Sequence, residues 1–319
     1  MHQPNGTYHL IDPQLLPVLD MLPAFAFSAE TLPAIRASLA AQIPERADPV
    51  IAAVEHVIAG PDGPIDLFWF DPAPGARDRP VLLHIHGGGM VIGSARQMQT
   101  GPSTLAASLG IPVASVEYRL APEGPFPGPQ EDCYAALAWL ATHAAALGIN
   151  PARIGVTGES AGGGLAAAVA MMARDRNGPA IAAQILVYPM LDHRVGGDAD
   201  PWNNHHTGEF VWTRSSNRFG WACLKGNYTV DDARKGWFSP SRAEDLAGLP
   251  PAWIGVGTLD LFFDENIDYA RRLVDAGVNT ELHCYPGAFH GFNMMSDTKM
   301  AKAFSRDMLD ATRRLLNVP

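Results

Sequence analysis

Short apolar segments alternate with longer segments of helical periodicity along most of this chain. The apolar segments that predict strands are residues 81–85, 113–118, 154–157, 181–188, 253–256 and 281–285. The segments that predict helices are residues 103–109, 131–147, 165–174, 265–276 and 299–316. Strands that are apolar along their whole length must be covered on both faces, so this order predicts an α/β fold with a mostly parallel sheet between helices.

The first 70 residues follow a different pattern. Apolar residues at helical spacing predict two short amphipathic helices, over residues 15–22 and 32–43. Residues 54–58 and 65–70 are two candidate strands, and a Pro-Asp-Gly turn at residues 61–63 lies between them. This region therefore predicts a helical N-terminal part followed by two strands.

A second departure lies between residues 191 and 248, which contain four tryptophans and few strand signals. We interpret this segment as an insertion over the sheet. The predicted organisation is one α/β domain made of residues 46–190 and 249–319. A helical cap is predicted to combine residues 1–45 with residues 191–248.

Composition and charge exclude several classes of protein. Hydrophobic residues make up 47 % of the 319 and charged residues 18 %, which argues against disorder. The net charge of −10, without a basic run, argues against binding to nucleic acid or to an anionic membrane surface. Cys133, Cys223 and Cys284 lie far apart, so neither a disulfide framework nor a metal site is expected. The N-terminus lacks the pattern of a signal peptide, and no stretch is long enough to span a bilayer, so we expect a cytoplasmic protein.

A nucleophile motif lies at the junction of a predicted strand and a predicted helix. Residues 158–162 read Gly-Glu-Ser-Ala-Gly, which matches the G-x-S-x-G pattern in its expected strand–turn–helix context. A sharp turn there crowds the backbone around Ser160, and the small residues Gly158, Ala161 and Gly162 relieve that crowding. The pattern predicts an exposed, nucleophilic serine. The alternative is a glycine turn that only joins the strand to the helix.

A glycine cluster after the strand at residues 81–85 predicts an oxyanion-binding loop. His86 precedes three glycines, and glycine lets the backbone approach a substrate closely. The expected N–H donors are those of Gly88, Gly89 and Ala161, and such donors are typically worth about 3–4 kcal/mol each. A phosphate-binding loop is the competing interpretation, but neither glycine-rich phosphate motif occurs here. We expect His86 itself to hold the loop by a hydrogen bond.

A serine nucleophile needs a base, and the base needs an acid that orients it. In this kind of fold the chain order is Ser, acid, His. His290 follows the last predicted strand and is the best candidate for the base. Asp260 follows the strand at residues 253–256, and catalytic loops gather at that end of parallel strands. Asp264 and Glu265 are alternatives for the acid, although we expect them to cap the next helix instead.

The chain resembles the hormone-sensitive-lipase-like esterases, the bacterial family IV carboxylesterases of the α/β-hydrolase fold. The resemblance rests on His-Gly-Gly-Gly at 86–89, Gly-Glu-Ser-Ala-Gly-Gly at 158–163, Tyr188-Pro189, Asp-x-x-x-Asp-Glu at 260–265 and His-Gly-Phe at 290–292. It implies a Ser160–His290–Asp260 triad, hydrolysis of short- to medium-chain carboxylic esters without a cofactor, and a possible homodimer. Glu159 departs from the family, where many members have Asp or Thr, and Leu261 stands where many have Pro.

The pocket and the exact reaction are less constrained by the sequence. Apolar side chains predicted to line the pocket are Met90, Phe210, Trp212 and Phe219, although each could instead belong to the core of the cap. An amidase or arylformamidase with the same triad remains an alternative, because esters and amides share a tetrahedral intermediate. A ligand receptor of the gibberellin-receptor type is a further alternative, but such receptors lack the catalytic histidine that is present here as His290.

Overall fold

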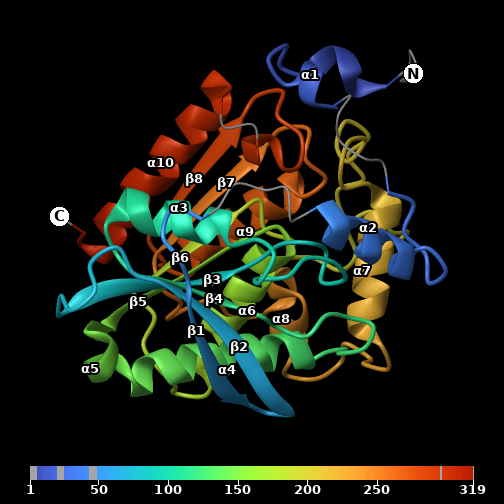
Figure 1. Ribbon diagram of the computed structural model, residues 1–319. Helices are drawn as coiled ribbons and strands as arrows, with labels where there is room; N and C mark the ends of the chain where they lie inside the picture. The colour runs from blue at the N-terminus through green and yellow to red at the C-terminus, as the bar shows by residue number, and fades with distance from the viewer. Residues whose placement is uncertain (1–5, 20–24, 43–48, 295–296, 319) are drawn as a thin grey trace.

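The computed structural model describes residues 6–19, 25–42, 49–294 and 297–318, and an eight-stranded sheet lies at its centre (Figure 1). The strand order is β1-β2-β4-β3-β5-β6-β7-β8. The strands are β1 (Val54–Gly60), β2 (Gly63–Phe70), β3 (Arg79–Ile85), β4 (Val113–Val116), β5 (Ile149–Glu159), β6 (Ala183–Val187), β7 (Ala252–Gly257) and β8 (Thr280–Tyr285). β2 runs antiparallel to β1 and β4, and the other neighbours are parallel, so the predicted, mostly parallel sheet is confirmed.

The sheet is apolar on both faces because successive side chains of a strand point to opposite sides. In β3, Leu83 packs in one buried cluster and Leu82 in the other. Helices α3 (Thr100–Leu109) and α10 (Lys299–Leu316) cover one face; α4 (Gly128–Thr142), α6 (Ala161–Asp175) and α9 (Phe263–Asp275) cover the other. Each fully buried Leu or Val contributes about 1.5–3 kcal/mol relative to exposure, so both faces stabilise the sheet.

One predicted helix is divided in the structure. The prediction of a continuous helix over residues 131–147 is wrong, because α4 ends at Thr142 and a short helix, α5 (Ala144–Leu147), follows. The backbone of His143 leaves the helical region, with φ −97° and ψ 9°. The His143 ring stacks on Trp139, and its Nδ1 lies 2.9 Å from the Trp139 carbonyl oxygen. A side chain that bonds to the backbone one turn earlier competes with continuation of the helix.

The N-terminal region and the insertion meet above the carboxyl ends of the strands. The N-terminal region contains η1 (Thr7–Leu10), α1 (Leu16–Leu19) and α2 (Leu32–Gln42); the insertion contains α7 (Arg214–Lys225), α8 (Lys235–Phe238) and η3 (Pro240–Arg242). Helices α2 and α7 lie side by side in Figure 1, and residues of both line one groove. Leu22 and Ile43, which the sequence placed in the two N-terminal helices, lie outside the described residues. The division into an α/β domain and a cap stays a prediction.

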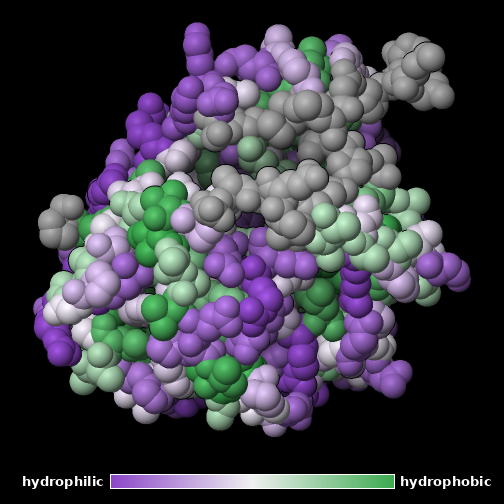
Figure 2. All heavy atoms as spheres, viewed as in Figure 1, coloured by the Kyte–Doolittle hydropathy of each residue, from purple (hydrophilic) through white to green (hydrophobic). Residues whose placement is uncertain are grey.

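On the side of the molecule drawn in Figure 2, polar and apolar residues alternate in small groups, and the described residues form no extended apolar patch there. None of the helices that the structure describes is both long and apolar enough to cross a bilayer. The described thiols of Cys133, Cys223 and Cys284 are unbridged, and they lie buried, half-buried and exposed, respectively.

Candidate active site

Ser160 sits on a strained turn between β5 and α6. Its backbone adopts φ 58° and ψ −120°, a region that costs a non-glycine residue about 1–3 kcal/mol. Three backbone hydrogen bonds hold the turn: the Ser160 N–H donates to Val187 O at 2.9 Å, and Ser160 O accepts from Gly164 N at 3.0 Å and from Met190 N at 2.9 Å. These contacts fix the serine at the carboxyl edge of the sheet.

Small residues on either side of the serine are required by close backbone contacts. A Cβ atom on Gly158 would lie 2.5 Å from Ile85 O, and one on Gly162 would lie 2.0 Å from the same oxygen. Both distances are shorter than any real contact of a Cβ atom with backbone, so glycine is needed at each position. The predicted crowding around the turn is therefore confirmed.

The glycine loop after β3 lies beside the serine, because a Cβ atom on Gly87 would be 3.4 Å from Ser160 Cβ. Gly88 and Gly89 have φ values of +121° and +59°, which glycine adopts without strain. Neither their N–H groups nor that of Ala161 donates to an acceptor in the described part of the chain. Three free donors at the start of a helix and on an adjacent loop are what an oxyanion requires.

The loop is held from both sides by side chains. The Tyr118 hydroxyl donates to His86 O at 2.8 Å, and the Tyr118 ring stacks on the His86 ring at 4.2 Å. His86 Nδ1 lies 2.8 Å from Gly87 O, which bears out the expectation that His86 holds the loop. From α2, the Arg36 guanidinium donates to Val91 O and Ala121 O, both at 2.8 Å.

Ser160, His290 and Asp260 form one hydrogen-bonded chain. His290 Nε2 lies 2.9 Å from Ser160 Oγ, and His290 Nδ1 lies 2.8 Å from Asp260 Oδ2. The second oxygen of Asp260 accepts the N–H of Phe262 at 2.9 Å, which fixes the carboxylate. All three residues are buried, with exposed fractions of 5 % for Ser160, 7 % for His290 and 0 % for Asp260.

Backbone bonds between two loops bring Asp260 and His290 together. The loop after β7 and the loop after β8 are tied by Leu259 N, which donates to Ala288 O at 2.9 Å. Gly287 N donates to the Thr258 hydroxyl, also at 2.9 Å. Because these bonds lock one loop against the other, Asp260 and His290 are held in register although they lie 30 positions apart in the chain.

The two rival acids lie elsewhere. Asp264 is in the first turn of α9, but no side chain forms a cap hydrogen bond there. Its carboxylate accepts instead from Asn204 Nδ2 at 2.8 Å, so the predicted cap is not seen. The prediction that Glu265 caps the helix is wrong, because its buried carboxylate accepts the N–H groups of Leu191 and Asp192, at 2.9 and 2.7 Å. Burial raises the pKa of Glu265 well above its usual value, and the nearby Asp192 raises it further. Sequence reasoning missed this role, since it depends on a contact across 73 residues.

Three aromatic rings surround the His290 imidazole, and the sequence analysis named two of them, Tyr188 and Trp212. Tyr188 meets the imidazole edge-on at 4.7 Å and Phe262 at 5.1 Å, and Trp212 lies 6.5 Å away. The Tyr188 hydroxyl donates to Asn293 Oδ1 at 2.7 Å. The Tyr188-Pro189 motif was a signal in the sequence for the ring of Tyr188 beside the imidazole, whereas no motif pointed to Phe262.

The four predicted pocket residues occupy different surroundings. Trp212 lies against the glycine loop, since a Cβ atom on Gly89 would be 2.0 Å from its ring. Phe219 stacks on Phe27 at 6.1 Å, and Phe27 in turn contacts Trp212. Met90 is buried directly after the loop, and Phe210 is buried against Phe289, at 6.1 Å. Their contact with substrate stays a prediction.

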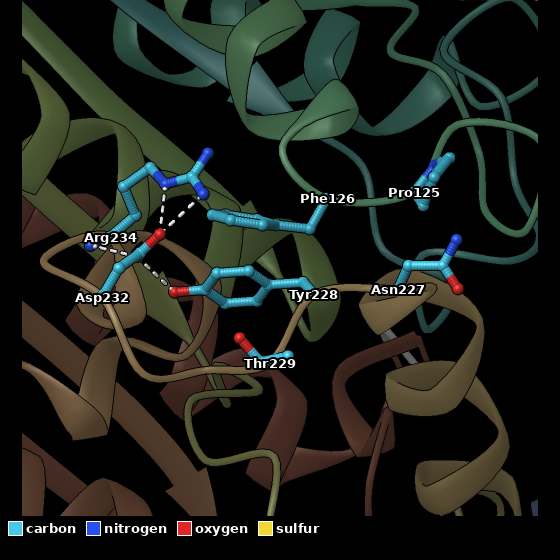
Figure 3. A pocket seen from close by; sticks show the side chains of 7 residues that line it. All are labelled: Pro125, Phe126, Asn227, Tyr228, Thr229, Asp232 and Arg234. Atoms are coloured by element: carbon cyan, nitrogen blue, oxygen red, sulfur yellow. Dashed lines mark hydrogen bonds and ion pairs between the residues drawn. The ribbon is translucent and has the colours of Figure 1, made fainter.

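Two hollows are lined in part by residues between 219 and 234. A groove of about 770 Å³ runs between α2 and α7, and Phe219 and Cys223 are among its lining residues. A second hollow, of about 370 Å³, is drawn in Figure 3; Arg234 lies over the Phe126 and Tyr228 rings there and pairs with Asp232. Neither hollow is lined by the Ser160–His290–Asp260 chain. Within the described residues, no group of three or more His, Cys, Asp or Glu side chains is placed to hold a metal ion.

The buried His86 predicts a pH dependence of stability. Burial lowers the pKa of His86 to about 4 from an ordinary value of 6.5. Because the unfolded chain takes up a proton on His86 below pH 6.5 and the folded chain does not, stability falls between pH 6.5 and 4, by about 3 kcal/mol in all. His86→Phe removes this contribution, so its free energy of unfolding should fall less steeply in that range. Urea unfolding at several pH values measures the slopes.

The control for this prediction is His206→Gln, which replaces an exposed histidine. Its slope should match that of the unmodified protein. Burial also lowers the pKa of His56 and His193, so only the difference in slope between the His86 variant and the parent is informative. Identical slopes for the His86 variant and the parent protein would contradict the assignment of this pH dependence to His86.

Comparison with known proteins places this geometry among ester hydrolases. A family profile described as "alpha/beta hydrolase fold" matches residues 82–294. The esterase LipI of Mycobacterium tuberculosis is 35 % identical over 294 residues, which cover 88 % of each chain. Carboxylesterase NlhH of the same species is 33 % identical over 305 residues and 92 % of each chain. A solved bacterial heroin esterase superposes with a TM-score of 0.88 at 38 % identity, over 98 % of this chain and 99 % of that one.

Proposed function

We propose that this chain, which belongs to the α/β-hydrolase family and to its hormone-sensitive-lipase-like carboxylesterases, cleaves short- to medium-chain esters through an acyl-enzyme on Ser160. The observation that carries this proposal is the unbroken hydrogen-bonded chain from Ser160 Oγ through His290 to Asp260. A hydroxyl is a weak nucleophile at neutral pH, and this arrangement supplies the base it lacks.

The first half of the reaction forms the acyl-enzyme. His290 Nε2 takes the proton of Ser160 as Oγ attacks the ester carbonyl carbon. The carbonyl oxygen becomes an oxyanion, and the N–H groups of Gly88, Gly89 and Ala161 stabilise it. When the tetrahedral intermediate collapses, the bond to the alcohol oxygen breaks. His290 then returns its proton to that oxygen, and the alcohol leaves.

The second half releases the acid. His290 removes a proton from a water molecule, whose oxygen attacks the acyl carbon. Collapse of this second intermediate breaks the bond to Ser160 Oγ, which regains the proton from His290. Throughout, Asp260 accepts the Nδ1 hydrogen bond, keeps the tautomer that leaves Nε2 free as a base, and stabilises the imidazolium that forms.

The size of the substrate is limited by what surrounds the nucleophile. Ser160 and His290 are almost entirely covered, and Trp212 and Tyr188 pack beside the imidazole. We therefore expect kcat/KM on p-nitrophenyl esters to be high for acetate and butyrate and to fall at least tenfold by decanoate, as a confined pocket rejects long chains. Initial rates across the series test this. Rates that rise steadily to decanoate would contradict a confined site, and no turnover of any ester would contradict the proposed function itself.

A further inference from the structure

Glu159 is an acidic side chain that the mechanism above does not use. It is the last residue of β5, directly before Ser160, and β5 is a central strand between β3 and β6. Nevertheless, 37 % of its side chain is accessible, whereas the His84 side chain beside it is only 5 % exposed. In α/β folds, substrates bind in the space outside the carboxyl ends of the central strands, which is where Glu159 lies. Glu159 therefore faces the same end of the sheet as the nucleophile.

The carboxylate of Glu159 has one side-chain partner among the described residues. Its Oε2 lies 3.1 Å from His84 Nε2, and His84 Nδ1 lies 2.9 Å from the Ser115 hydroxyl. Burial opposes ionisation of the carboxyl group, but the charge and hydrogen bond of His84 outweigh it and hold the pKa of Glu159 below its usual value. The side chain is thus a carboxylate at neutral pH, with accessible surface left for a cationic ligand.

The wider electrostatic surroundings also favour a positive ligand. The chain carries a net charge of −10, which draws cations toward its clefts. Arg36, the guanidinium that holds the glycine loop, is already paired with Glu123.

We propose that Glu159 is a specificity-determining residue that selects esters carrying a positive charge, such as a protonated amine or a quaternary ammonium group. The inference rests on the proposed function and names the substrate class of the same site. The cation lies beside the Glu159 carboxylate while Ser160 attacks the ester carbonyl. A neutral ester of the same shape lacks this interaction and reacts more slowly.

The test uses two esters that differ only in charge. Acetylcholine and 3,3-dimethylbutyl acetate have nearly the same shape, because a tert-butyl group replaces the trimethylammonium group. We expect kcat/KM of the wild-type enzyme to be about tenfold higher for acetylcholine than for the neutral ester. A partly desolvated contact between a carboxylate and a cation typically gives a difference of this size. Glu159→Gln should abolish this preference, and Glu159→Asp should keep part of it. Glu244→Gln is the matched control, because it removes the same charge from a side chain that is 82 % exposed.

The outcomes separate recognition from a structural role. If Glu159 only supports the turn through His84, Glu159→Gln lowers the rates on both esters equally and the ratio stays unchanged, which overturns the proposal. Equal wild-type rates on the two esters overturn it as well, even if the variants do not fold. In that case, serine-dependent cleavage of the neutral ester leaves the proposed function intact, whereas failure to cleave either ester, or p-nitrophenyl acetate, contradicts the proposed function.

Discussion

Replacing Ser160 with alanine lowers kcat on p-nitrophenyl acetate by about 10⁴-fold or more. The hydroxyl is the group that bonds to the acyl carbon, and alanine leaves His290 without a nucleophile to activate. Residual turnover reflects attack by water assisted by the N–H groups of the glycine loop, which the substitution does not touch. The measurement is a burst-phase and steady-state comparison of the two proteins.

The fold of this variant should survive the substitution. Ser160 holds its turn through backbone bonds to Val187, Gly164 and Met190, and alanine keeps all three. Equal melting temperatures, together with loss of labelling by a fluorophosphonate probe, would show that chemistry and not folding was lost. A variant that keeps most of the ester turnover would overturn the assignment of Ser160.

Replacing Asp260 with asparagine lowers kcat by about 10²- to 10⁴-fold. The carboxylate accepts the Nδ1–H of His290, and it is completely buried, so no water replaces it. An amide that points its NH₂ group at Nδ1 stabilises the tautomer with the proton on Nε2, which cannot take the proton of Ser160. The asparagine oxygen can still accept the N–H of Phe262, so the loop keeps its conformation.

Asp264→Asn is the matched control for this prediction. Asp264 lies four residues further on, at the start of α9, and its carboxylate binds Asn204 rather than histidine. We expect a change in kcat of less than about threefold, as for a substitution that does not touch reacting groups. Steady-state kinetics from pH 6 to 9 compare the variants, and an equal loss in both would contradict the assignment of Asp260.

Individual side-chain contacts explain where sequence reasoning failed. Glu265 was expected to cap α9, because carboxylates are common in the first turn of a helix. In the structure it reaches the segment after β6 and accepts two backbone N–H groups there. Likewise, the break between α4 and α5 depends on how the His143 ring packs on Trp139. Neither contact has a pattern in the sequence that distinguishes it from the common alternative.

The sequence by itself determined the order of strands and helices, the strand–turn–helix motif around Ser160 and the glycine loop at residues 86–89. These features are local, because apolar periodicity and the dihedral freedom of glycine act within a few residues. Only the tertiary structure decided that Asp260 and not Asp264 reaches His290, and that Trp212 from the insertion lies against Gly89. These contacts join segments tens of residues apart, and their geometry is set by backbone bonds between loops that no local pattern encodes.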